Sequence, residues 1–417
     1  MQDNLEKSTF CLYIPKFCSN FAGKIENGSM TLSPRIAGLS ESSTLRMAAQ
    51  CRAMQAQGID VISMALGEPD MDTPEPIRRA AQAAIENHMS HYGPVPGLAS
   101  LREAVAAYQN RRPGNAITYK AEDVLVTVGA KHAICNAIET VVGPGDEVII
   151  PTPSWVSYTE MVRLAEGQTV CVPTRFEDRY CLTPEQLRHA LTPRTKMLLL
   201  CSPNNPTGSV YTRTQLDGLM AVLRDYPQVV VLADEIYSAL TYGEPALTLA
   251  AYPDMAERLI IVNGVSKAYA MTGYRIGWLL AKDKTFVSAC GRLQSQQLTC
   301  ASVPAQAAAQ AALTLPVDSS ILDTFTRRRE LIVRLAGDIP GFRFTEPQGA
   351  FYLFPDVRAI GDADVLTEYL LHEAHVAVVS GSAFGCPDCI RLSYAISESQ
   401  IIEAMRRIKE AVCRRKN

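Results

Sequence analysis

The chain has 417 residues, of which 47% are hydrophobic and 20% charged, and its formal net charge is −3 at pH 7. This length and composition suffice for a substantial core in two domains, or three. The slightly acidic balance lacks the basic signal of a nucleic-acid binder, and no stretch approaches the ~18 apolar residues of a membrane span. Small-molecule chemistry is therefore the default interpretation.

The first 29 residues read as an irregular extension, and Met30 is a plausible natural start. No basic region leads into an apolar one here, so we expect no secretion signal. Twelve cysteines are scattered along the chain, and some, such as Cys171 and Cys201, lie in apolar runs where a thiol behaves as a small buried hydrophobe. This usage favours a reducing compartment, and we expect a cytoplasmic protein.

The one CxxC motif, Cys386 with Cys389, has no second cysteine pair at the spacing of a metal site, and the histidines form no HExxH motif. We therefore expect no metal site. We interpret the two cysteines as loop thiols in preference to a redox or zinc site.

Apolar runs of strand length recur in the middle of the chain. They cover residues 124–128, 147–150, 169–172, 196–201, 228–233 and 259–262, and helix-like segments separate most of them. Several runs are apolar throughout, as is typical of strands covered on both faces. The alternation predicts an α/β fold with a mainly parallel sheet.

The pattern changes in residues 313–417. A helical stretch at 326–337 precedes short strands within 349–355, 375–381 and 389–395, and a helix at 398–415 closes the chain. These elements predict a smaller α+β domain. Residues 30–72 are too short to fold alone and should pack into it, which leaves 73–312 as the large domain.

Polar residues and glycine follow the predicted strands at their carboxyl ends, where ligands bind in open α/β sheets. In chain order they are Gly129 with Ala130 and Lys131, then Trp155, then Asn205, then Asp234 and Tyr237, and finally Lys267. Gly129, Trp155 and Asn205 also have ordinary explanations as a strand end, a core residue and a turn residue. Asp234 and Lys267 are harder to explain, because a charge beside a buried strand needs a partner.

Together these residues match the needs of pyridoxal phosphate. This cofactor requires an amine to bond to its aldehyde, an acid for its pyridine nitrogen, donors to its phenolic oxygen, an anion cradle and an aromatic face. The residues for these roles, in the same order, are Lys267, Asp234, Asn205 with Tyr237, Gly129 to Lys131 with Ser266 and Arg275, and Trp155.

Nine motifs in order carry a family resemblance. Among them are "ALGEPDMDTP", "HYGPVPGLASLREAV", "VTVGAKHA", "SPNNPTGSVY", "ADEIY", "NGVSKAYAMTGYRIGW" and "IRLSYA", spread from about residue 35 to 415. The chain resembles the class I pyridoxal-phosphate aminotransferases of fold type I, in the branch of bacterial aspartate and prephenate aminotransferases. The resemblance implies a seven-stranded, mainly parallel sheet flanked by helices, plus a smaller α+β domain.

By position, the resemblance makes Lys267 the residue that bonds to the cofactor and Asp234 the partner of the ring nitrogen. The remaining cofactor contacts would come from Asn205, Tyr237, Trp155, Ala130, Lys131, Ser266 and Arg275. Arg391 would pair with the substrate α-carboxylate, with the backbone of Gly67 beside it. One departure is Gly264, where some members carry a phosphate-binding serine, so the cradle would rely more on Ser266 and Arg275.

The resemblance implies ping-pong transamination from an L-amino acid, with aspartate expected, to 2-oxoglutarate. Lys131 would pair with the distal carboxylate, and Trp155 and Asn205 would also contact substrate. The active unit would be a homodimer in which Tyr92 reaches the neighbouring subunit's phosphate.

Other functions stay open at this point. Gln297 and Leu298 stand where the branch often has small hydroxyl residues, which would suit an aromatic or prephenate-type substrate. A β-elimination lyase or a cyclase could use the same cofactor residues. A cofactor-sensing transcription regulator would need a DNA-binding domain for which the N-terminal segment is too short. A binding protein without catalysis is disfavoured by the presence of Lys267, Asp234 and Arg391.

Overall fold

The computed structural model describes residues 32–316 and 319–416. The expected extension over 1–29 and the proposed start at Met30 lie outside the described residues. The chain divides into two units, with the boundary between Gly38 and Leu39. Helix α1 (Pro34–Ala37) belongs to the first unit, and the other described elements belong to the second.

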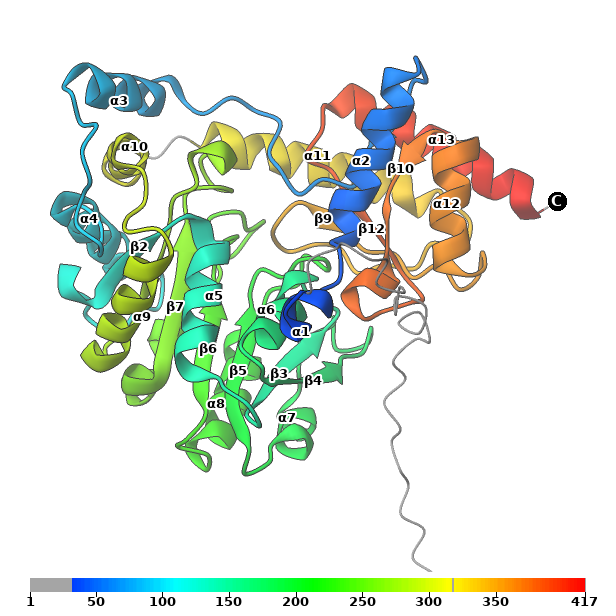
Figure 1. Cartoon of the computed structure of the whole chain (residues 1–417). Helices are drawn as coiled ribbons and strands as arrows, with labels where there is room; N and C mark the ends of the chain where they lie inside the picture. The colour runs from blue at the N-terminus through cyan, green and yellow to red at the C-terminus, as the bar shows by residue number, and fades with distance from the viewer. Residues whose placement is uncertain (1–31, 317–318, 417) are drawn as a thin grey trace, which may run out of the picture. The chain divides into compact units, whose positions relative to one another are not determined.

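A seven-stranded sheet forms the core of one group of elements (Figure 1). Its strands are β2 (Val124–Thr127), β3 (Glu147–Thr152), β4 (Gln168–Pro173), β5 (Thr195–Cys201), β6 (Val230–Asp234), β7 (Leu259–Gly264) and β8 (Gly277–Leu280). They lie in the order β2-β8-β7-β6-β5-β3-β4. Strand β8 is antiparallel to both neighbours, and the other pairs are parallel. The predicted mainly parallel sheet is confirmed.

Helices cover both faces of this sheet, because the central strands are apolar on both sides. Met197 and Leu199 of β5 pack into one buried cluster, whereas Leu198 and Leu200 of the same strand pack into another. The helices of the first cluster are α5 (Gly129–Val141), α6 (Ser157–Leu164) and α9 (Lys284–Gln297). Those of the second are α4 (Ala99–Asn110), α7 (Pro184–Ala190), α8 (Arg213–Arg224) and α10 (Val303–Thr314), and α3 (Glu75–Glu86) packs against α10.

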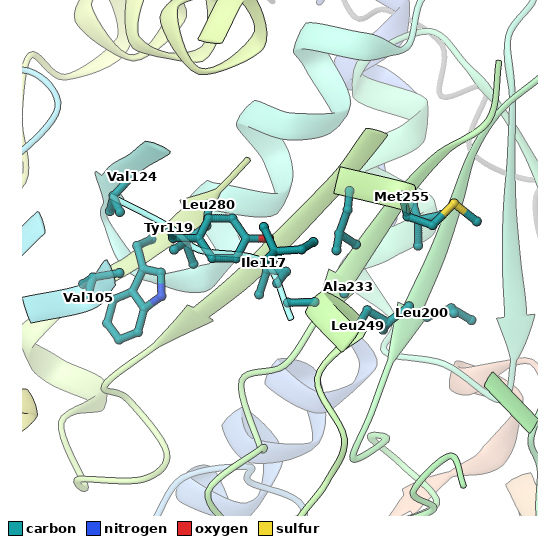
Figure 2. Close-up of a cluster of buried hydrophobic side chains, with 14 of the residues drawn as sticks. Val105, Ile117, Tyr119, Val124, Leu200, Ala233, Leu249, Met255 and Leu280 are labelled. Atoms are coloured by element: carbon teal, nitrogen blue, oxygen red, sulfur yellow. The ribbon is translucent and has the colours of Figure 1, made fainter. Parts of the chain in front are cut away.

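Figure 2 shows part of the second cluster, to which Leu200, Ala233 and Leu280 of β5, β6 and β8 and Val105 of α4 all belong. Met255, from the 3-10 helix η4 (Pro253–Arg258), belongs to the same cluster. Burial of each large apolar side chain contributes about 1.5–3 kcal/mol relative to exposure. Packing of this kind on both faces holds the strands firmly, and with them the loops at their carboxyl ends.

The C-terminal elements form smaller sheets with helices around them. The elements are α11 (Ser320–Gly337), β9 (Tyr352–Leu353), α12 (Ala363–Glu373), β10 (Val376–Ala377), β11 (Val379–Ser380), β12 (Ile390–Ser393) and α13 (Glu398–Lys416). Strand β12 pairs antiparallel with β11 and β9. Strand β1 (Ile62–Ser63), which follows α2 (Ser43–Ala56), pairs parallel with β10. The expected α+β elements are therefore present, while the exact domain boundaries stay a prediction.

Edge strand β4 differs from the expectation of buried strands. It lies at the edge beside β3, and each of its six residues is exposed or partly buried. The expectation of a buried thiol is therefore wrong for Cys171, which is exposed, and right for Cys201 on the central strand β5. Within residues 32–316 and 319–416, no helix combines the length and the apolar character that crossing a membrane would require.

Candidate active site

The carboxyl ends of the central strands open into a cavity of about 320 Å³. Eleven of the twelve predicted site residues line it, namely Gly67, Ala130, Lys131, Trp155, Asn205, Asp234, Tyr237, Ser266, Lys267, Arg275 and Arg391. The twelfth, Tyr92, is not among the lining residues, and 89% of its surface is exposed. The residues that follow different strands thus meet at one place, as the strand-end argument predicted.

Lys267 follows β7 and reaches across the cavity. Its Nζ donates a hydrogen bond of 2.6 Å to the carbonyl oxygen of Gly67. Burial lowers the pKa of Lys267 to about 8, with Glu68 opposing this shift and Arg275 and Arg391 adding to it. The unprotonated amine, which is the form that acts as a nucleophile or a base, is therefore far more populated near neutral pH than for an ordinary lysine, at about a tenth of the molecules at pH 7.

Asp234 ends β6, and two donors hold its carboxylate from different sides. The hydroxyl of Tyr158 donates to Oδ2 at 2.6 Å, and the backbone N–H of Ile236 donates to Oδ1 at 3.1 Å. Burial nevertheless raises the pKa of Asp234 to about 6. A buried, oriented carboxylate of this kind suits a cationic ring nitrogen, which would compensate for the water that the carboxylate has lost.

Arg391, on β12, is a buried cation, since only 2% of its surface is exposed. Its guanidinium lies between the rings of Tyr352 and Phe384, at 4.6 and 4.8 Å from their centroids. Nη1 donates to Oδ1 of Asn205 at 3.0 Å, and Nη2 donates to the carbonyl oxygen of Ala65 at 2.5 Å.

The remaining nitrogen of Arg391, Nε, is buried and has no hydrogen-bond partner among the described residues. No ion pair between described residues includes this guanidinium, and burial lowers its pKa. Arginine binds planar carboxylates through paired N–H groups. Among the described residues, the site therefore contains a buried cation without an anionic partner, which suits an anionic ligand.

The start of α5 forms a cradle beneath Arg275. Gly129 has a φ of +78°, and a Cβ there would lie 2.5 Å from Nη2 of Arg275. Gly277 of β8 approaches so closely that its own Cβ would meet the backbone nitrogen of Ala130 at 2.3 Å. The first N–H groups of a helix have no partner inside it, and with Arg275 they make a suitable site for a phosphate.

Gly264 explains the departure noted in the sequence. A Cβ at this position would lie 2.9 Å from the carbonyl oxygen of Ile276 and 3.0 Å from the Cα of Gly277. The paired strands β7 and β8 thus leave little room for a side chain there. Ser266, which is buried and lines the cavity, is the nearby hydroxyl that remains for an anion.

Aromatic residues form further parts of the wall. Trp155 meets Tyr158 edge to face, with ring centroids 5.3 Å apart, and Nζ of Lys131 lies 4.9 Å from the Trp155 centroid. The hydroxyls of Tyr237 and Tyr352 are 2.8 Å apart, and burial raises the pKa of Tyr237 well above its usual value. Tyr237 is therefore a neutral hydroxyl that can donate a hydrogen bond.

Sequence reasoning missed several lining residues. They are chiefly Tyr158, Tyr352, Glu68 and Thr272, of which the last two hydrogen-bond to each other. Tyr158 lies on α6 three residues after Trp155, and Tyr352 lies on β9 inside "GAFYLF". The sequence pattern distinguishes neither tyrosine from an aromatic residue of the core. Glu68 stands next to the predicted Gly67, so the motif "LGEPD" was the one place where a closer reading could have found a residue.

The lining residues give the cavity a positive balance. Four cations, Lys131, Lys267, Arg275 and Arg391, face two carboxylates, Glu68 and Asp234. Such a site favours ligands with more than one negative group.

Comparison with known proteins identifies the family. Residues 59–408 match the model of the aminotransferase class I and II family. A bifunctional aspartate aminotransferase and glutamate/aspartate-prephenate aminotransferase of Petunia hybrida is 40% identical over 400 residues, which cover 92% of this chain and 83% of the relative.

Solved structures agree with this assignment. The aspartate aminotransferase of Rhizobium meliloti superposes with a TM-score of 0.89 at 37% identity, covering 93% of this chain and 100% of the other. The aspartate aminotransferase of Thermus thermophilus with maleate gives 0.87 at 37% identity, with 92% and 100% covered. The chain therefore belongs to the class I and II aminotransferases of fold type I, a family that uses pyridoxal phosphate.

The raised pKa of Asp234 predicts how stability depends on pH in the cofactor-free protein. The folded pKa is about 6 and the ordinary value 3.8. Between these values the folded protein holds a proton that the unfolded chain has released, so the wild type loses stability as the pH rises. Asp234→Asn lacks this loss, and its stability relative to wild type should increase between pH 4 and 6.

Urea unfolding midpoints measured from pH 4 to 8 would test this prediction. The same substitution at Asp225, an exposed residue at the end of α8, controls for the removal of one carboxylate. A difference between Asp234→Asn and wild type that does not change with pH would contradict the assignment.

Proposed function

We propose that the protein is a pyridoxal-phosphate-dependent aminotransferase that moves the amino group of L-aspartate to 2-oxoglutarate. One observation carries the proposal: the buried guanidinium of Arg391 has an unpartnered Nε and lines the same cavity as Lys267. A buried charge is costly unless it is paired, so this residue is suited to a carboxylate that enters with the substrate. The family of the chain supports the same reaction.

The residues present fit the cofactor. Lys267 would bond to its aldehyde and Asp234 would pair with its ring nitrogen, while Asn205 and Tyr237 would reach its phenolic oxygen. Trp155 would lie against the ring, and the phosphate would bind at the cradle formed by the backbone of Ala130 and Lys131 with the side chains of Ser266 and Arg275. When bound, pyridoxal phosphate supplies an electron sink for the charge that develops at the substrate Cα.

The chain's own residues then position the substrate and move a proton. Arg391 would bind the α-carboxylate beside the backbone of Gly67, which fixes the Cα next to Lys267. The amine of Lys267, with its pKa lowered to about 8, can accept the Cα proton at Nζ near neutral pH. Asp234 stays ionised beside a cation because the attraction offsets the burial that raises its pKa.

Lys131 supports the choice of a dicarboxylic substrate. Its Nζ lies over Trp155 at the cavity wall, and its side chain is exposed and free to meet a second carboxylate. The Thermus thermophilus relative is described with maleate, which is itself a dicarboxylate. Aspartate and 2-oxoglutarate both carry the two carboxylates that Lys131 and Arg391 would bind.

A prephenate-type donor is the second candidate. Leu45 and Leu66 line the cavity and are 60% and 37% exposed, so an apolar surface borders the polar site. The Petunia hybrida relative combines both activities in its name. Among the described residues that line the cavity, Leu298 is absent, and its suggested effect on an aromatic or prephenate-type substrate stays a prediction. The cytoplasmic location is a prediction as well.

The role of Lys267 can be tested by substitution and by chemical trapping. Lys267→Ala should retain pyridoxal phosphate without a covalent bond and lose turnover, because the nucleophile and the base are both removed. Borohydride reduction followed by peptide mass analysis should locate the cofactor on Lys267 in the wild type. Attachment to Lys131 or another lysine would contradict the assignment.

Lys131→Ala should lower kcat/KM for aspartate by about 10- to 150-fold, since a hydrogen bond to a charged group contributes roughly 1.5–3 kcal/mol. Alanine, which has no distal carboxylate, should be turned over almost as before. Lys284→Ala, at an exposed pair with Glu122, is the matched control.

Equal losses for both donors would show that Lys131 serves the cofactor instead. The same assay measures 2-oxoglutarate-dependent oxo-acid formation together with ammonia release. Stoichiometric ammonia would show that the enzyme is a lyase and would contradict the proposed aminotransferase.

We also propose a homodimer with shared sites. Tyr92 lies outside the cavity of its own chain and is 89% exposed, which supports a role at a neighbouring subunit. Sedimentation of the active enzyme at assay concentration should show a dimer, in which Tyr92 would contact the neighbouring subunit's site. A fully active monomer would contradict this proposal.

A further inference from the structure

The CxxC motif lies in the turn that leads into β12. The two sulfurs, Sγ of Cys386 and Sγ of Cys389, are 3.5 Å apart. Backbone hydrogen bonds close the turn: Cys386 N–H donates to the carbonyl oxygen of Gly381 at 2.9 Å, and Gly381 N–H donates to that of Cys389 at 2.7 Å. The two thiols are thus already side by side in the folded chain.

The two cysteines differ in access and in acidity. Cys386 is partly exposed between the exposed residues Gly385 and Pro387, whereas Cys389 is buried with its Sγ 3.5 Å from the hydroxyl of Tyr180. The side-chain hydrogen bond between the two thiols lowers the pKa of Cys386 and raises the pKa of Cys389. An accessible thiol with a lowered pKa, beside a second thiol, is the usual arrangement of a reactive dithiol.

The same turn supports the carboxylate site. Arg391 follows Cys389 by two residues on β12, and Phe384, two residues before Cys386, lies 4.8 Å from the guanidinium. The carbonyl oxygen of Phe384 accepts a hydrogen bond of 3.0 Å from the backbone of Ser154, in the loop that carries Trp155. A change in the turn therefore reaches both the arginine and one wall of its pocket.

We propose that Cys386 and Cys389 are a redox-modification site, and that closing them to a disulfide weakens carboxylate binding at Arg391. The oxidant is a low-molecular-weight disulfide such as glutathione disulfide. The Cys386 thiolate attacks one of its sulfurs and releases one glutathione thiolate, which leaves a mixed disulfide. The Cys389 thiol then loses its proton and attacks Cys386, which releases the second glutathione. Two protein thiols are oxidised, and one glutathione disulfide is reduced to two thiols.

Closure has a mechanical consequence. A disulfide brings the sulfurs to about 2.05 Å, from 3.5 Å in the dithiol. A contraction of this size, two residues from Arg391, shifts a guanidinium that the surrounding donors and rings hold in one position. Misplacement by about 1 Å can cost a reaction about 100-fold in rate, and the two hydrogen bonds of a carboxylate to a guanidinium are directional in the same way. We expect dicarboxylate binding to weaken about 10-fold in the oxidised enzyme.

The first experiment maps the disulfide. The holoenzyme is equilibrated in mixtures of reduced and oxidised glutathione, alkylated, digested and analysed by mass spectrometry. The peptide with Cys386 and Cys389 should lose two hydrogen atoms in oxidising mixtures and regain them on reduction. Free thiols at both positions in pure glutathione disulfide, or a glutathione adduct on Cys386 that persists, would overturn the proposal.

The second experiment measures coupling to the site, and this arm rests on the proposed function. Calorimetric titration with maleate should give a dissociation constant about 10-fold higher for oxidised than for reduced wild type. Cys386→Ser should bind equally in both conditions, whereas Cys413→Ser, at an exposed cysteine on α13, should behave as wild type. Unchanged affinity in a fully oxidised wild type would overturn the coupling.

Failure of the proposed function would look different. A holoenzyme that binds no maleate in either redox state would contradict dicarboxylate binding at Arg391. In that case the coupling to carboxylate binding would be overturned as well, while the peptide mapping would still decide whether the two cysteines form the reversible disulfide.

Discussion

The buried charge of Arg391 is the constraint on which the rest of the site depends. A guanidinium withdrawn from water costs free energy unless hydrogen bonds and an opposite charge compensate for it. Asn205, the carbonyl oxygen of Ala65 and two aromatic rings supply part of that compensation, but Nε has no acceptor among the described residues. The same arrangement that is unfavourable without an anionic ligand makes the site selective, because a bound carboxylate would supply the acceptor and the charge that the described residues do not provide.

The position of Arg391 also explains why the smaller sheets belong to the site. The arginine lies on β12, whereas Asn205, Asp234 and Lys267 follow strands of the seven-stranded sheet. Hydrogen bonds connect the two groups of elements, from Arg391 to Asn205 and from Lys267 to the carbonyl oxygen of Gly67. Only glycine fits at position 67 without a shift of its neighbour, since a Cβ there would lie 2.3 Å from the hydroxyl oxygen of Tyr352. The cavity therefore needs both groups to be complete.

Much of this structure could be predicted from sequence, for identifiable physical reasons. Strands covered on both faces must be apolar throughout, so β2, β3 and β5 to β7 were marked by their composition. The short strand β8 was not among the predicted strands, although it lies within the apolar residues 276–281 and begins with the glycine that lets α5 approach. The exposed Cys171 was predicted wrongly, since an apolar run does not reveal whether its strand lies at an edge.

The site residues divide in the same way. Asp234 and Lys267 were found because charges beside buried strands are unusual, whereas Arg391 looked like an ordinary strand residue until the family resemblance was considered. Tyr158 was not found at all, although it donates the shorter of the two hydrogen bonds to Asp234. A tyrosine in an apolar helix face has the same pattern whether it fills the core or orients a carboxylate. Only the three-dimensional contact separates these two roles.

Asp234 and Lys267 show a further consequence of burial. The pKa of the carboxyl is raised to about 6 and that of the amine is lowered to about 8, so burial disfavours the charged form of each. The cofactor proposed for this site would reduce the cost of burying both groups. A cationic ring nitrogen would compensate the charge of the carboxylate, and a covalent bond would replace the free amine. A ligand that binds only the folded chain stabilises it by mass action. The residues that lower the stability of the cofactor-free protein are thus the ones that would make cofactor binding favourable, which links folding and function through the same two side chains.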